Sequence, residues 1–153
     1  MGVFEHYRSR YDASQEERYT LKSFLEICRS DATAYATAAE RLLLSVGTPE
    51  FVDTSKDARL SRIFSNKVIK RYPAFDEFYG MEEAIEQIVS FFRHAAQGLE
   101  ERKQILYLLG PVGGGKSSLA ERLKSLMQRM PFYAIEGSPV NESPLGLFDA
   151  AED

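Results

Sequence analysis

The chain has 153 residues, of which 44% are hydrophobic and 27% are charged, and its net charge is −4 at pH 7. Such a composition is typical of a soluble globular protein of one domain, or one and a half, and argues against general polyanion binding. The single cysteine, Cys28, excludes an intrachain disulfide and predicts a reducing cytoplasm, and no apolar run is long enough to span a membrane.

The first 72 residues predict an N-terminal helical region. Phe4, Tyr7 and Tyr11 are spaced for a short amphipathic helix within residues 1–18. Thr20 can cap a helix that reaches about residue 29, and Asp31 can cap a second helix that ends at Gly47. Because only a short turn separates these two helices, we expect them to pack together as a helical hairpin.

A basic cluster occupies residues 50–72, where apolar residues recur at helical spacing. The cluster consists of Lys56, Arg59, Arg62, Lys67, Lys70 and Arg71. Such charges can bind the phosphates of a nucleic acid. The helical spacing of the apolar residues instead favours a solvated helix face or a subunit contact, so a nucleic acid is the weaker interpretation.

The second region, residues 73–153, alternates helix and strand patterns. An apolar stripe that includes Ile85, Ile88 and Val89 predicts a helix over residues 81–97. The apolar run 104–109 predicts a buried parallel strand, and a helix follows the next loop to about residue 129. Residues 132–135 are a second strand candidate, and residues 137–153 are rich in turn formers.

The loop between the first strand and its helix is the most informative feature of the chain. Residues 110–117 read Gly-Pro-Val-Gly-Gly-Gly-Lys-Ser, a full match to the Walker A pattern G-x-x-x-x-G-K-[ST]. Glycines lack a Cβ, so the backbone can wrap closely and direct its N–H groups at phosphate oxygens. The helix that starts near Gly115 directs its positive end at the same anion. The strand, loop and helix together predict an ATP site.

We assign phosphate binding to Gly110, Pro111, Val112, Gly113, Gly114, Gly115, Lys116, Ser117 and Ser118. Lys116, the predicted catalytic residue, reaches the β- and γ-phosphates, and the Ser117 hydroxyl binds the magnesium ion. Ser118 can add a hydroxyl near the α-phosphate, or it can be a surface residue at the start of the helix.

Two parts of a working P-loop ATPase are not evident in these residues. A carboxylate on a neighbouring strand normally helps to hold magnesium. Asp149 is the one superficial candidate, but Pro144 and Gly146 argue against a central strand before it. No arginine finger is evident, and about two strands cannot form a covered parallel sheet. We therefore expect the chain to be the N-terminal portion of a longer protein.

The chain resembles the PrkA family, bacterial proteins labelled serine protein kinases. The resemblance covers nearly the whole chain and is strongest in residues 71–75, 78–87 and 108–124. It implies an α/β fold: a truncated P-loop NTPase, AAA-like, with a parallel sheet core in residues 73–153 and the helical region 1–72 before it. It also implies that Tyr79, Gly80 and Met81 touch the adenine, although Tyr79 can equally be a packing residue and Gly80 a turn residue.

Two functional hypotheses follow. In the first, the chain is the Mg-ATP-binding part of a PrkA-like kinase or AAA ATPase, with a protein substrate or regulator as partner and a homo-oligomer as its assembly. Because the H-R-D and D-F-G motifs of ordinary protein kinases are not in this sequence, any phosphotransfer needs residues outside it. In the second, the chain is a non-catalytic helical interaction or oligomerisation module whose P-loop does not function.

Overall fold

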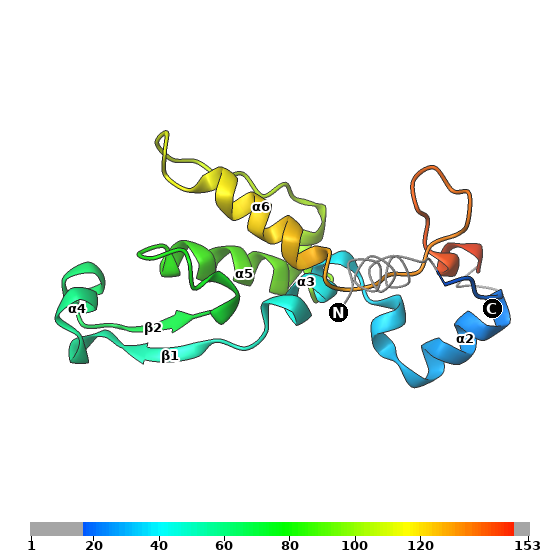
Figure 1. Ribbon diagram of the computed structural model, residues 1–153, viewed down its shortest axis with the longest axis horizontal. Helices are drawn as coiled ribbons and strands as arrows, with labels where there is room; N and C mark the ends of the chain where they lie inside the picture. The colour runs from blue at the N-terminus through cyan, green and yellow to red at the C-terminus, as the bar shows by residue number, and fades with distance from the viewer. Residues whose placement is uncertain (1–16, 149–153) are drawn as a thin grey trace, which may run out of the picture.

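The computed structural model describes residues 17–148, so the helix predicted around Phe4, Tyr7 and Tyr11 lies outside the described residues. The helices and strands, in chain order, are α2 (Leu21–Ser30), α3 (Ala38–Val46), β1 (Glu50–Asp53), α4 (Ala58–Phe64), β2 (Val68–Arg71), α5 (Glu82–Ala96) and α6 (Lys116–Met127). In Figure 1, α6 lies over α5, the strands β1 and β2 run below α5, and α2 lies at the opposite end from α4. Within residues 17–148, no helix is both long and apolar enough to cross a membrane.

One apolar core lies between α3, α5 and α6. Its buried members are Leu42, Val46, Tyr72, Phe75, Ile85, Ile88, Val89, Leu119 and Leu126. Full burial of one such aliphatic or aromatic side chain contributes about 1.5–3 kcal/mol, so this core outweighs the short sheet as a source of stability. The core residues come from both sides of position 72, where the domain boundary proposed from the sequence stays a prediction.

The second of the two N-terminal helices starts later than predicted, and the two helices do not pack together as predicted. Thr20 caps α2 as expected, but Asp31 caps only a 3-10 turn, Ala32–Tyr35. The helix α3 begins later because Thr37 and Glu40 form a reciprocal capping box, in which each side chain accepts the other residue's backbone N–H. The predicted helical hairpin is wrong: α3 packs mainly against α5 and α6, whereas Phe24 of α2 contacts Tyr133, with ring centroids 5.2 Å apart.

Residues 50–71 contain a β-hairpin that the sequence pattern does not predict. The strands β1 and β2 pair antiparallel, with Val52 opposite Ile69, and α4 connects them. Four of the six basic side chains in this segment meet a carboxylate. The pairs are Lys56–Asp53, Lys67–Glu83, Lys70–Glu86 and Arg71–Asp76. Because these side chains already have carboxylate partners, the structure does not favour the nucleic-acid interpretation.

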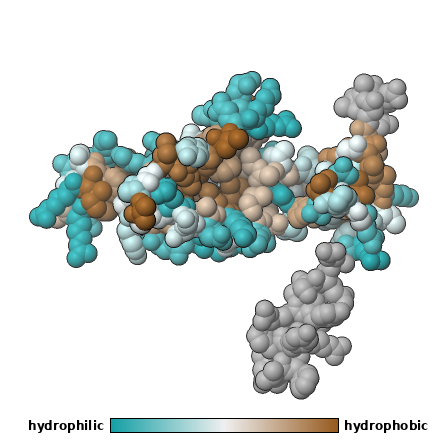
Figure 2. Space-filling view, turned by 90° about the horizontal axis from the view of Figure 1, so that it is seen from above, coloured by the Kyte–Doolittle hydropathy of each residue, from teal (hydrophilic) through white to brown (hydrophobic). Residues whose placement is uncertain are grey.

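The predicted parallel sheet is not formed by the described residues, whose only sheet is the β1–β2 pair. Residues 104–109 contain no strand, and neither do residues 132–135. The alternation of a strand nevertheless persists in the first segment: Leu106 and Leu108 pack against the core, while Ile105, Tyr107 and Leu109 are 77–91% exposed. A strand is defined by its hydrogen-bonded neighbour, and no described segment supplies one here. Apolar surface over the middle of the molecule is visible in Figure 2.

Candidate nucleotide-binding site

The Walker A residues form a tight bend directly before α6. Gly113 and Gly115 have φ values of +80° and +74°, in the left-handed region that side chains other than glycine's rarely adopt. The amide of Gly114 donates to the Pro111 carbonyl at 3.2 Å and closes the turn, and α6 begins at Lys116 with Gly115 as its N-cap. The predicted start of this helix is therefore confirmed, and the chain reverses immediately in front of it.

The start of α6 leaves several backbone donors available. The first hydrogen bond into this helix runs from the Leu119 amide to the Gly115 carbonyl, and within residues 17–148 no backbone acceptor meets the amides of Gly115, Lys116 or Ser117. These N–H groups belong to the unsatisfied first turn of a helix, where the helix dipole adds a partial positive charge. An anion placed before the helix can accept hydrogen bonds from all of them.

The Lys116 ammonium lies inside the loop. It donates to the Gly110 carbonyl at 2.8 Å and to the Pro111 carbonyl at 2.5 Å. The side chain thus folds back over the bend that precedes its own helix. To bind phosphate oxygens, the ammonium would give up its two hydrogen bonds to neutral carbonyls. Hydrogen bonds to charged phosphate oxygens are stronger than these, so the exchange is favourable.

The remaining loop residues have distinct positions. Val112 is fully exposed at the tip of the bend. Ser117 and Ser118 are exposed in the first turn of α6. The Ser117 hydroxyl provides an oxygen ligand of the kind that Mg²⁺ prefers. Within residues 17–148 no group of three or more His, Cys, Asp or Glu side chains could hold a metal ion, and Asp149 lies outside the described residues. A magnesium ion at Ser117 would therefore take most of its ligands from phosphate oxygens and water.

The segment predicted to touch adenine lies next to the loop. Met81 is the N-cap of α5, and Gly80 before it has a φ of +77°. A Cβ added to Gly115 would lie 3.3 Å from the Met81 sulfur, so these two positions are in close contact. Tyr79 is 82% exposed. The fold thus brings Met81 to the phosphate loop and leaves the ring of Tyr79 in solvent beside it.

Arg122, on α6, was not identified from the sequence. Its Nε donates to the Ala74 carbonyl at 2.7 Å and lies 3.5 Å from a carboxylate oxygen of Glu77. An arginine on the polar side of an amphipathic helix carries no local signal of such a contact, because its partners are 45 or more residues earlier in the chain. A cavity of about 760 Å³ lies between Glu77, Phe78 and α6 as far as Ser125, and it includes Gly115 and Ser117.

A contact at the far end of α5 positions the segment that leads into the loop. His94 Nδ1 and Glu101 Oε1 lie 3.0 Å apart and join α5 to the turn before residue 104. A hydrogen bond from its own backbone amide, followed by the one to His94, lowers the pKa of Glu101 below its usual 4.5. The carboxylate form that holds this turn is thereby favoured.

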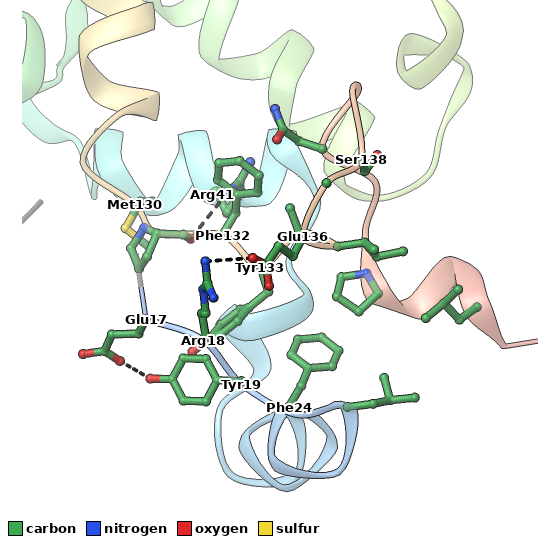
Figure 3. A pocket seen from close by; sticks show the side chains of 18 of the residues that line it. Glu17, Arg18, Tyr19, Phe24, Arg41, Met130, Phe132, Tyr133, Glu136 and Ser138 are labelled. Atoms are coloured by element: carbon green, nitrogen blue, oxygen red, sulfur yellow. Dashed lines mark hydrogen bonds and ion pairs between the residues drawn. The ribbon is translucent and has the colours of Figure 1, made fainter. Parts of the chain in front are cut away.

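A larger cavity, of about 1140 Å³, lies away from the Walker loop (Figure 3). It is bounded by the start of α2, by Arg41 of α3 and by residues 130–147. Three cationic side chains line it: Arg18 pairs with Glu136 at 2.9 Å, Lys124 lies 3.8 Å from Glu121, and the Arg41 guanidinium lies 4.9 Å from the centre of the Phe132 ring, with its Nε buried and without a hydrogen-bond partner among the described residues. Within residues 17–148 this cavity therefore contains one incompletely satisfied cation and no cluster of unpaired charges.

Comparison with known proteins agrees with the loop. A family model described as the PrkA AAA domain matches residues 19–153. The chain is 66% identical to the protein named serine/threonine kinase YeaG of Escherichia coli strain K12, over all of this chain and 24% of that protein. It is 35% identical to the protein named ATP-dependent protease PrkA of Bacillus subtilis strain 168, over 84% of this chain and 20% of that protein. The chain thus spans about a fifth to a quarter of the length of these curated relatives. No solved structure matches it.

Proposed function

Because the chain belongs to the PrkA AAA domain family, we propose that it is the ATP-binding part of a longer ATP-dependent protein. The observation that carries the proposal is the Walker loop itself: two glycines in the left-handed region, a first helical turn with free amides, and the Lys116 ammonium folded over the bend. In this proposal residues 110–118 surround the triphosphate, as expected from the sequence. Lys116 leaves the carbonyls of Gly110 and Pro111 and binds the β- and γ-phosphates.

The magnesium ion belongs to the same proposal. Bound to the phosphates, it neutralises charge that develops during phosphoryl transfer. In this chain the Ser117 hydroxyl would hold it, and Lys116 and the α6 amides would orient the triphosphate and stabilise its charge. Met81, Gly80 and Tyr79 form the wall on the adenine side, a role supported by the contact between Met81 and Gly115.

We also propose that residues 104–109 belong to a parallel sheet in the whole protein. Residues 104–109 have one apolar face on the core and the other in solvent, with Ile105 91% exposed. Both faces of a parallel strand are normally covered, and its two edges are hydrogen bonded. We assign this segment as the strand that precedes the phosphate loop in a sheet whose other strands come from the rest of a protein as long as its relatives.

The names of the two relatives differ in the reaction that they state, kinase in one and ATP-dependent protease in the other. The second name states ATP and a kinase requires a phosphoryl donor, so the proposal is limited to ATP binding and the ATP-dependent action of the whole protein. We also propose that the whole protein acts with a protein substrate or regulator, assembles as a homo-oligomer and is located in the cytoplasm.

The Lys116→Ala variant tests the proposal in the intact protein. Titration of a fluorescent ATP analogue, with and without magnesium, should show saturable binding by the unchanged protein. The variant should bind at least about tenfold more weakly, because it loses a charged hydrogen-bonding group in a site built for an anion. The matched control is Lys103→Ala, which removes an exposed lysine whose ion pair with Glu100 spans 3.8 Å. Equal affinity for the variant and the unchanged protein would contradict the assignment of the loop.

A second candidate, a non-catalytic interaction or oligomerisation module, is favoured by apolar side chains exposed on the N-terminal helices and the turn between them. These are Leu21 and Leu25 of α2, Tyr35 of the turn, and Leu44 of α3. Under this alternative the protein forms a defined oligomer and binds no ATP analogue. The same titration, combined with sedimentation analysis, separates the two candidates.

A further inference from the structure

One side chain of α6 connects this helix to the segment that leads into residues 79–81. Arg122 donates from Nε to the Ala74 carbonyl at 2.7 Å and lies 3.5 Å from Glu77. Its side chain is only 24% exposed, whereas that of Glu77 is 62% exposed. The hydrogen bond to Ala74 is therefore the better protected of the two contacts, and the ion pair to Glu77 is largely a surface interaction.

The segment from Ala74 to Met81 is held at three places. Phe75 is buried in the core, Arg122 binds the Ala74 carbonyl, and Met81 contacts Gly115. Between these places lies a turn with no regular hydrogen-bond ladder, which contains the left-handed Gly80. Because α6 begins at the phosphate loop, the contact between Arg122 and Ala74 also fixes the position of this segment relative to the loop.

We propose that Arg122 is a positioning residue for the nucleotide: through Ala74 it sets the spacing between the adenine-side segment 79–81 and the Walker loop. The inference rests on the proposed function, since it assumes that ATP occupies this site. It assigns Arg122 no contact with the nucleotide. Arg122 also lines the cavity between Glu77, Phe78 and α6, which includes Gly115 and Ser117 of the loop.

The test compares two ligands of the intact protein, ATP and inorganic tripolyphosphate, each with magnesium. Tripolyphosphate carries the anionic part alone and needs only the loop, whereas ATP also contacts the adenine side. Loss of a charge-assisted hydrogen bond in Arg122→Ala should weaken ATP binding about tenfold and leave tripolyphosphate binding within about twofold. A role in stability alone would lower both affinities equally.

Two further variants separate the contacts of Arg122. In Arg122→Gln the side-chain amide nitrogen stands as many bonds from the backbone as Nε, so the donor to Ala74 is retained without the charge. This variant should keep ATP affinity within about threefold, because a neutral hydrogen bond remains. Glu77→Gln removes only the exposed ion pair and should change the ATP affinity by less than about twofold. Lys124→Ala, two residues further along α6 and paired only with Glu121 at 3.8 Å, is the matched control.

Each outcome has a definite meaning. Selective loss of ATP binding in Arg122→Ala, with rescue by Arg122→Gln, supports the inference. Equal loss of both ligands, or no loss of either, overturns it and leaves the proposed function intact. Failure of the unchanged protein to bind either ligand overturns the proposed function and the inference together. If Arg122→Ala does not fold, as judged by circular dichroism, then Arg122→Met takes its place, because methionine has about the length of glutamine but no donor for the Ala74 carbonyl. ATP affinity as high in Arg122→Met as in Arg122→Gln would contradict the role of the Ala74 contact.

Discussion

Replacement of Gly115 by alanine tests the geometry of the loop independently of any ligand. At a φ of +74° an alanine pays about 1–2 kcal/mol, because its Cβ approaches the following carbonyl oxygen. The new Cβ would also lie 3.3 Å from the Met81 sulfur. That contact adds less than about 1 kcal/mol, since a thioether side chain is flexible and can move by a few tenths of an ångström. We expect a loss of about 1–2 kcal/mol in the free energy of unfolding.

Two companion variants divide this loss between its causes. Gly113→Ala has a φ of +80° and no atom within 4 Å of the new Cβ, so it carries the backbone cost alone. Gly146→Ala has neither a positive φ nor a close neighbour, and it should change the free energy of unfolding by less than about 0.5 kcal/mol. The excess of Gly115→Ala over Gly113→Ala then measures the contact with Met81.

The assay is urea denaturation of the intact protein at 25 °C, followed by circular dichroism, with the midpoint as the measured quantity. ATP binding should fall in Gly115→Ala as well, because the amide directions of the first turn depend on the left-handed bend. An unchanged urea midpoint for both Gly113→Ala and Gly115→Ala would refute the reasoning, since it would mean that neither residue has the backbone conformation described above.

Two further predictions concern the core and the acid side of the pH range. Leu126 is fully buried in the core, so its replacement by alanine should lower the free energy of unfolding by about 2–5 kcal/mol. Leu44→Ala, at a side chain that is 54% exposed, should lower it far less. Similar urea midpoints for the two variants would contradict the packing described here. Hydrogen bonds from the amide and then the hydroxyl of Thr37 lower the pKa of Glu40 below its usual 4.5. The stability that Glu40 contributes is therefore complete above about that pH and is lost as the pH falls through the lowered value. Glu40→Gln should accordingly flatten the decline in thermal stability below pH 4.5, and an unaltered acid slope would count against the capping box.

Local signals in the chain were sufficient for the loop and for most of the predicted helix ends. The cap at Thr20, the stop at Gly47, the apolar stripe of α5 and the start of α6 at Gly115 all depend on neighbours within a few residues, and each was predicted correctly. Asp31 shows where such signals compete, because the capping box at Thr37 and Glu40 starts the helix later.

Contacts between distant residues could not be predicted in this way. The β1–β2 hairpin pairs residues 15 to 21 positions apart, and the interleaved charges obscured its alternation. Residues 104–109 have the composition of a strand, but a strand forms only against a partner whose position the local pattern does not encode. Arg122 finds the Ala74 carbonyl across 48 residues.

By itself the sequence determined a Walker A loop between an apolar segment and a helix, because its glycines act there through local backbone geometry. Only the tertiary structure decided which elements surround that loop: Met81 against Gly115, Arg122 on Ala74, and a core shared by α3, α5 and α6. The physical reason is range. Capping and helical periodicity act over three or four residues, whereas packing and hydrogen bonding between segments depend on how the whole chain folds.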